Sequence, residues 1–175
     1  MTNRRGIIVE GQHDAIVYDS LLRKMGFIPK IRIARGNQRM IRKIHVYVEM
    51  LRDKNYNKIV ALKDLNSRTI DELYDECSDF PSDVSLCIAK KTMEAWLLSD
   101  EEALRTQFKN PRVSTFNHPE ELDDPKSTLR RLYLENGKKY VAKRALPKII
   151  NHMNIQKIRD KCPSFSEFET ALHSF

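Results

Sequence analysis

Four short runs rich in apolar, β-branched residues divide the first half of the chain. Residues 6–10, 58–63 and 84–89 form compact apolar runs, which are typical of strands buried on both faces of a parallel sheet. The run at 27–34 alternates apolar and basic residues, and Pro29 favours an edge position for that strand. Between the runs, the segments 14–25, 38–53 and 69–77 carry apolar residues at helical spacing. This alternation predicts an α/β fold with about four largely parallel strands.

In the second half of the chain, the pattern predicts helices and a long loop in place of alternating strands and helices. Thr92 is positioned to cap a short helix with Glu94 in its first turn, and Asp100 to cap the next helix. Residues 110–126 show little periodicity and predict a loop, whereas helical patterns return at 126–136, 141–152 and 164–172. We therefore expect an α/β body at residues 1–109. A loop and helical extension at residues 110–175 is expected to pack on it as one compact unit.

Composition narrows the class of protein. The chain has 175 residues, of which 41% are hydrophobic, so it fits a single domain with a sizeable core. No apolar run approaches the roughly 18 residues that span a bilayer, and the N-terminal apolar segment is too short for a secretory signal. We expect a cytoplasmic protein. Cys77, Cys87 and Cys162 are scattered without CxxC spacing, so the sequence indicates neither a disulfide framework nor a zinc site.

The distribution of charge says more than the net charge of +7. Basic residues outnumber acidic ones by 13 to 5 in residues 1–60 and by 11 to 2 in residues 126–161. In residues 61–125 the acids prevail by 15 to 7. Basic surfaces suit a polyanion such as nucleic acid, and clustered acids suit a divalent cation or simple solvation.

Three acids follow predicted strands. Glu10 ends the first run, Asp64 follows the third, and Glu94 lies just beyond the fourth. Parallel strands end at the same edge of a sheet, where open α/β sheets bind ligands. Two carboxylates delivered there can hold one hard cation such as Mg²⁺ between them. The sequence therefore predicts an acidic site at this edge, although a single strand-end acid can equally be a solvated loop residue.

The motifs and their order resemble a known family. VEGQHD after the first strand and KDLNS after the third resemble the Toprim fold of topoisomerases, primases, RecR-type recombination proteins and OLD-family nucleases. KKTMEAWLLSD, DDPKSTLRRLY and CPSFSEFETAL resemble small prokaryotic Toprim-like proteins allied to the OLD nucleases and often associated with phage defence. The resemblance implies a three-layer Toprim-like sandwich. Within its motifs, Glu10 matches the first-strand glutamate, Asp64 the first aspartate of Asp-x-Asp, and Glu94 the glutamate before Ala-Trp.

The resemblance also implies roles for individual residues. Glu10, Asp64 and Glu94, with Asn66 at the position of the second aspartate, would hold one or two Mg²⁺ or Mn²⁺ ions beside a phosphodiester. Glu10, Asp64 and Lys90 would be the catalytic residues, with Lys90 stabilising charge on the scissile phosphate. The residues expected to hold the nucleic-acid backbone are Arg35, Arg39, Arg42, Lys43, Lys91, Lys138, Lys139, Lys143 and Arg144.

Asn66 departs from the family pattern. An amide oxygen ligates Mg²⁺ without adding charge, so a second ion would be held less tightly, and one-metal chemistry or binding without cleavage stays open. We predict a metal-dependent nuclease acting on DNA in preference to RNA, with an ATPase as a protein partner. The alternative is a non-catalytic nucleic-acid-binding or partner-binding component of a defence or repair system. A phosphohydrolase of small nucleotides is a third alternative, which the broad basic segments disfavour.

Overall fold

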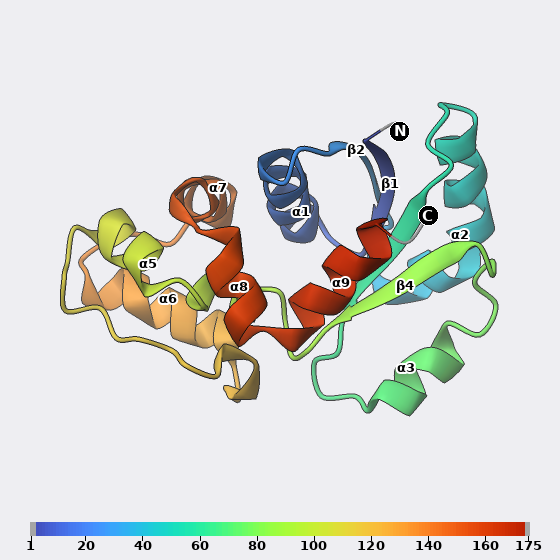
Figure 1. Cartoon of the computed structure of the whole chain (residues 1–175). Coiled ribbons are helices and arrows are strands. Elements are labelled where there is room, and N and C mark those ends of the chain that lie inside the picture. Colours follow the sequence, from blue (N-terminus) through green and yellow to red (C-terminus); the bar gives the residue numbers. More distant parts are fainter. Residues whose placement is uncertain (1–2, 174–175) are drawn as a thin grey trace.

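A four-stranded parallel sheet forms the centre of the protein (Figure 1). The computed structural model describes residues 3–173. The strands pair in the order β2-β1-β3-β4, and every neighbouring pair is parallel. This confirms the predicted α/β fold class and the edge position of β2. The strand bounds are β1 (Arg4–Val9), β2 (Ile28–Ile33), β3 (Ile59–Asp64) and β4 (Val84–Ala89).

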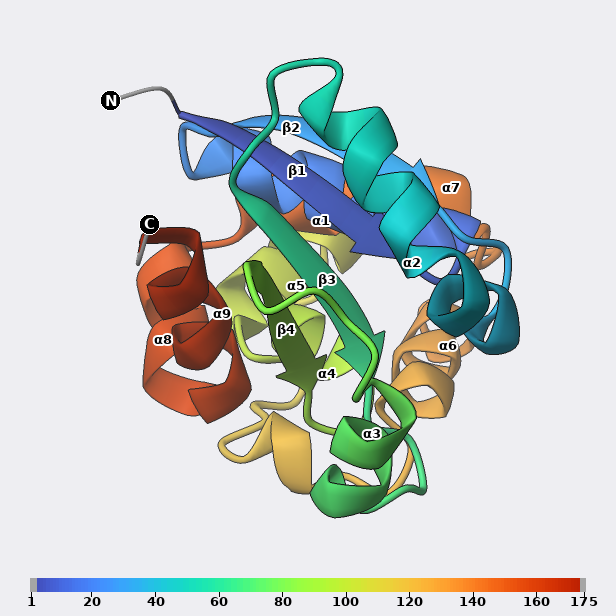
Figure 2. The same ribbon diagram turned by 90° about the vertical axis from the view of Figure 1, so that its right-hand side faces the viewer.

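Helices cover both faces of the sheet, with most of them on one side (Figures 1 and 2). The helix that joins β1 to β2 lies on one face, and the helix that joins β2 to β3 lies on the other. The helices are α1 (Gln12–Lys24), α2 (Asn37–Arg52), α3 (Ile70–Glu76), α4 (Glu94–Leu98), α5 (Glu101–Phe108), α6 (Pro125–Glu135), α7 (Ala142–His152), α8 (Ile155–Lys161) and α9 (Pro163–His173), with a 3₁₀ turn at Pro119–Glu121.

The pleat of β3 divides its side chains between two hydrophobic clusters. Val60 and Leu62 pack with α1 and the later helices, in a cluster that includes the edge-to-face pair of Tyr18 and Trp96. Ile59 and Ala61 pack on the other face against α2. Because successive side chains of a strand point to opposite faces, the last two residues of β3 also diverge.

The C-terminal helices pack against the α/β part. Helix α7 lies against α1, and α9 lies against β4. The C-terminal helices therefore pack on elements from the first half of the chain. The boundary between an α/β body at residues 1–109 and an extension at residues 110–175 stays a prediction. Within residues 3–173, none of the helices combines the length and the apolar content needed to cross a bilayer.

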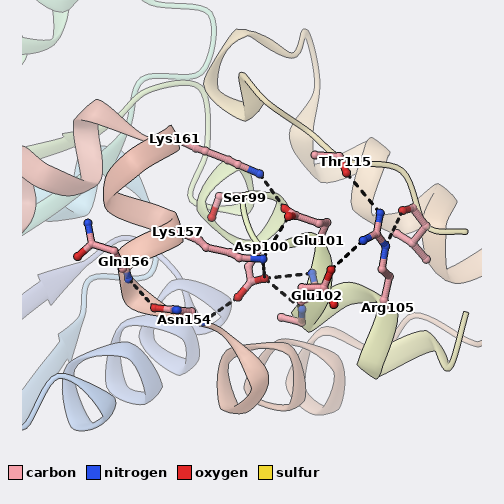
Figure 3. Close-up of polar contacts among 12 residues, drawn as sticks. Ser99, Asp100, Glu101, Glu102, Arg105, Thr115, Asn154, Gln156, Lys157 and Lys161 are labelled. Carbon is pink, nitrogen blue, oxygen red and sulfur yellow. Dashed lines mark hydrogen bonds and ion pairs between the residues drawn. The ribbon is translucent and has the colours of Figure 1, made fainter. Parts of the chain in front are cut away.

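Helix α8 was not predicted, because its sequence IQKIRDK offers few apolar positions and only Ile158 is buried. Its position is fixed by polar contacts to the start of α5 (Figure 3). Asp100 caps α5, as predicted, by accepting hydrogen bonds from the N–H groups of Glu102 and Ala103 at 3.1 and 3.2 Å. Its second oxygen accepts a hydrogen bond from the Asn154 N–H at 2.7 Å. One buried carboxylate therefore organises the starts of two helices.

Candidate functional site

Acidic side chains gather where the central strands end. Glu10 follows β1, Asp64 ends β3 and Glu94 begins α4 after β4, and these three strands are neighbours in the sheet. A small cavity of about 50 Å³ lies at this edge. Its lining residues are Glu10, Asp14, Tyr18, Leu62, Lys63, Asp64 and Asn66. The strand ends thus bring Glu10, Asp64 and Asn66 to one cavity.

The surroundings of Asp64 disfavour its charged form. Its Oδ1 atom accepts a hydrogen bond from the Met93 N–H at 3.1 Å, which favours the charged form. Burial raises the pKa of Asp64 well above its usual value, and the negative charges of Asp14, Glu94 and Glu10 raise it further. A carboxylate in such surroundings is stabilised by a cation, so Asp64 has the environment expected of a metal ligand.

Asp14 is a site residue whose role the sequence did not reveal. It lies in the first turn of α1, where its Oδ2 atom accepts a hydrogen bond from the Gly11 N–H at 2.8 Å. The sequence suggested only this helix-start role. Asp14 also lines the acidic cavity, and its charge raises the pKa of Asp64. The available signal was its position in the sequence, because Asp14 lies in the first turn of the helix that begins directly after Glu10 and Gly11.

Tyr18 lies one turn further along α1 and lines the same cavity. Its hydroxyl is buried and has no hydrogen-bond partner among residues 3–173. Burial raises the pKa of Tyr18 well above its usual value, and the charges of Asp64 and Asp14 add to the shift. A buried hydroxyl without a partner costs free energy, so this atom is available to an occupant of the cavity.

Glu10 contacts a cation supplied by the chain itself. Lys63, whose side chain is fully buried, places Nζ 3.2 Å from Glu10 Oε1 and 3.8 Å from Glu76 Oε2. The same ammonium group donates a hydrogen bond to Asn37 Oδ1. The geometry between Lys63 and Glu10 is that of an ion pair only, because Glu10 Oε1 has no hydrogen-bond partner in the described part of the chain. The sequence did not predict this contact.

The loops after β3 and β4 meet beside the acidic cavity. Asn66 and Lys91 both have left-handed backbone conformations, with φ of 54° and 64°, and the Asn66 N–H donates to the Lys91 carbonyl at 2.8 Å. Non-glycine residues in this conformation often mark functional sites. A second cavity of about 390 Å³ lies here, lined by Asn66, Ser67, Lys91, Thr92, Asp123, Asp124, Pro125 and Lys126.

In the segment after β4 one expectation was wrong, and one predicted site residue lies away from the acidic cavity. Thr92 does not cap α4, because Met93 is the N-cap residue and the helix has no side-chain cap. Lys90 lines neither of the two cavities just described. It lines a separate one of about 350 Å³ between α3, β4 and α9, whereas Lys91 is the lysine beside Asn66.

Apart from Lys91, the predicted nucleic-acid-binding residues fall into two surface groups. Arg35, Arg39, Arg42 and Lys43 are exposed on the β2–α2 turn and on α2. Lys138, Lys139 and Arg144 line a cavity of about 410 Å³ with Lys148, next to Tyr133 and Gln107. Lys143 is exposed but does not line this cavity. Lys148 was missed because the sequence patterns gave no reason to separate it from other surface lysines.

The donor chemistry of the acidic site fits a hard divalent cation, because it consists of carboxylate, amide and hydroxyl oxygens. Glu10 and Tyr18 line the same cavity, and within residues 3–173 neither Glu10 Oε1 nor Tyr18 Oη has a hydrogen-bond partner. No three Asp, Glu, His or Cys side chains within residues 3–173 surround a common point as metal ligands.

Comparisons with known proteins agree with this architecture. The sequence model of the family described as "Domain of unknown function (DUF4276)" matches residues 9–173. No curated protein matches the chain. Among solved structures, the C-terminal region of the Burkholderia pseudomallei OLD protein is similar, with a TM-score of 0.50 and 15% identity over 97% of this chain and 98% of that one.

The C-terminal region of the Xanthomonas campestris pv. campestris OLD protein is also similar, with a TM-score of 0.46 and 16% identity over 98% of this chain and 96% of that one. At these identities the likeness concerns the fold alone. The match to the Burkholderia protein extends over nearly the whole chain and supports the Toprim-like α/β fold that the sequence predicts.

Proposed function

The chain belongs to the family described as "Domain of unknown function (DUF4276)", and we propose that it is a metal-dependent phosphodiesterase that cleaves nucleic acid. One observation carries the proposal. Asp64 is half-buried at the carboxyl edge of a parallel sheet, and desolvation together with the charges of Asp14, Glu94 and Glu10 raises its pKa. Strongly shifted acids in a cavity at this edge are typical of functional sites. The sequence resemblance to OLD-family nucleases points to the same chemistry.

The acids Asp14, Asp64 and Glu94 would hold the cation, which is Mg²⁺ or Mn²⁺. When bound, such an ion supplies Lewis acidity toward a phosphoryl oxygen and favours ionisation of an attacking water. The hydrogen bond from the Met93 N–H fixes the orientation of Asp64. Glu10 and the Tyr18 hydroxyl line the same cavity, so Tyr18 is placed to donate a hydrogen bond to a ligand oxygen.

The phosphodiester would lie along the neighbouring cavity between the loops after β3 and β4. Lys91, after β4, and Lys126, at the start of α6, both line that cavity, and both can neutralise phosphate charge. The two basic surface groups described above extend the positive surface beyond the cavities. Contacts of this kind bind the backbone without reading sequence, which suits a nuclease of broad specificity.

A second candidate function is nucleic-acid binding without cleavage. It is favoured by the finding that no three ligand side chains within residues 3–173 surround a common point. In that case the acids would tune the surface charge, and the basic residues would do the binding.

Cleavage of labelled single- and double-stranded DNA and RNA, with Mg²⁺, Mn²⁺ or EDTA, separates the two functions. The proposed nuclease cuts at least one polymer with a divalent cation and none with EDTA. Binding to any of the polymers with no cleavage in either cation would favour the second candidate.

A further inference from the structure

The cavity of about 350 Å³ that Lys90 lines runs along the outer edge of β4, between α3 and α9 (Figure 1). β4 is the last strand of the sheet, and within residues 3–173 no further strand pairs with it. Leu86 and Cys87 both line the cavity, although they pack with the clusters on opposite faces of the sheet. The cavity therefore crosses the open edge of the strand. It shares no lining residue with the two cavities at the strand ends.

Much of the wall of this cavity is apolar. Leu86 and Ile88 line it from β4, and both are partly buried. Ile70 and Tyr74 line it from α3, with 53% and 54% of their surfaces exposed. A concave site of this volume, with apolar walls and a few polar groups, is typical of small-molecule binding sites. The apolar body of a ligand placed here would cover side chains that are otherwise exposed to water.

Glu120 supplies a buried carboxylate to the same cavity. It lies in the 3₁₀ turn and is only 3% exposed. Its Oε1 atom accepts hydrogen bonds from Trp96 Nε1 at 3.2 Å and from the Ser164 hydroxyl. Its Oε2 atom accepts only a long hydrogen bond, from the Ser164 N–H at 3.4 Å. All three donors are neutral, so hydrogen bonds hold the carboxylate in place without adding a positive charge.

Within residues 3–173, no basic side chain forms an ion pair with Glu120. Lys90 lines the cavity but is exposed to solvent. Glu167, on α9, lines it as a second acid. Removing a carboxylate from water is costly unless a positive charge compensates it. The charge of this cavity is therefore complementary to a cationic ligand.

We propose that this cavity binds a small organic cation, namely a protonated amine that carries an apolar or aromatic group. The ammonium lies against Glu120, and the apolar group covers Ile88 and Tyr74. A metal ion does not suit this cavity, because hard cations require several oxygen ligands and the walls are largely apolar. The inference is independent of the proposed function, since it concerns a different cavity and a different ligand.

Titration of the intact, ¹⁵N-labelled protein with 2-phenylethylamine, followed by NMR, tests the proposal. Trp96 is the only tryptophan, so its indole N–H gives one resonance, and that N–H donates to Glu120. The amine is expected to shift this resonance saturably. 2-Phenylethanol has the same shape with a hydroxyl in place of the ammonium, and it should bind at least about tenfold more weakly. No saturable shift up to about 10 mM amine, or equal affinity for amine and alcohol, would overturn the proposal.

A matched pair of variants tests the carboxylate. Glu120→Gln keeps the shape of the side chain and should weaken binding of the amine by about tenfold or more, to the level of the alcohol. Glu121→Gln removes an exposed acid from the same turn and should leave affinity within about twofold of wild type. Equal weakening by both variants, or no weakening by Glu120→Gln, would overturn the proposal.

The apolar wall is tested by Tyr74→Ala. Tyr74 is exposed, so the variant is expected to fold, and dispersed amide resonances check this. Losing this cover should weaken binding of amine and alcohol alike by about threefold or more. Unchanged affinity for both would overturn the placement of the ligand. If Glu120→Gln does not fold, the comparison of amine with alcohol in wild type still decides, because it needs no variant.

Discussion

Asp64 Oδ1 accepts a hydrogen bond from the backbone N–H of Met93 at 3.1 Å. This contact joins the end of β3 to the start of α4, so that Glu94, the next residue, is delivered to the same face as Asp64. Glu94 is buried and Asp64 is half-buried, and the charge of Glu94 raises the pKa of Asp64. Desolvation and the charge of Asp14 raise the pKa of Asp64 as well.

Removing the charge of Asp64 should stabilise the metal-free protein. Its pKa is raised in the folded state, so the ionised side chain disfavours folding once the pH rises above its usual value of 3.8. Asp64→Asn should raise the melting temperature near pH 7 in EDTA by roughly 2–4 °C, which corresponds to about 1 kcal/mol in a chain of this size. The gain should disappear below about pH 4.

Scanning fluorimetry across pH measures the melting temperatures of wild type and Asp64→Asn. Asp79→Asn is a matched control, because Asp79 is exposed. A fall in melting temperature near pH 7 that is equally large at pH 4 would mean that Asp64 is not under electrostatic strain.

Glu101 should make the protein sensitive to acid. Burial opposes its charge, but hydrogen bonds from Lys161 at 2.7 Å and Lys157 at 3.1 Å outweigh burial and lower the pKa of Glu101 to about 2. The lowered pKa stabilises the fold above the usual value of 4.5, and this contribution is lost as the pH falls toward 2. Urea unfolding at several pH values should therefore show wild type losing its advantage over Glu101→Gln between about pH 4.5 and 2. A difference between the two proteins that does not vary over this range would contradict the ion-pair account.

Ser164 should stabilise the fold through a buried polar network. Its hydroxyl accepts a hydrogen bond from Trp96 Nε1 at 2.9 Å and donates one to Glu120, whose carboxylate is also buried. Ser164→Ala leaves the Glu120 carboxylate short of a donor, and we expect a loss of about 1–3 kcal/mol in the free energy of unfolding. Denaturant unfolding followed by Trp96 emission measures it. A loss within about 0.5 kcal/mol would show that the network is unimportant for stability.

The cavity lined by Lys139 and Arg144 should contribute to nucleic-acid binding through charge alone. Replacing both with Gln should weaken binding to DNA of unrelated sequences by similar factors. The slope of log affinity against log salt should fall by about 0.9 for each phosphate that the variant no longer neutralises. Fluorescence anisotropy in a salt series measures both effects, with the exposed Lys54→Gln as control. An unchanged slope would show that this cavity lies outside the binding surface.

Local patterns in the sequence predict most of the framework of the site. The apolar runs of β1, β3 and β4 place Glu10, Asp64 and Glu94 at neighbouring strand ends, because parallel strands share an edge. Lys63 could not be predicted in the same way. Its burial depends on the face it occupies in the pleat and on Asn37 and Glu76, which come from elements distant in the sequence.

Helix α8 could not be predicted for a similar reason. It is held by ion pairs from Lys157 and Lys161 to Glu101 rather than by an apolar stripe. Hydrophobic spacing reports which elements form. It says little about which charged side chains those elements bring together.

Under the proposed function, the carboxylate of Asp64 supports metal-dependent cleavage. The most direct measurement compares wild type, Asp64→Asn and the control Asp79→Asn at equal protein concentration. The substrates are labelled DNA and RNA, with Mg²⁺ or Mn²⁺ and with EDTA. We predict cleavage by wild type and Asp79→Asn with a divalent cation, none with EDTA, and a loss of at least about 100-fold in Asp64→Asn. Cleavage by Asp64→Asn at the wild-type rate, or cleavage by wild type in EDTA, would contradict the account.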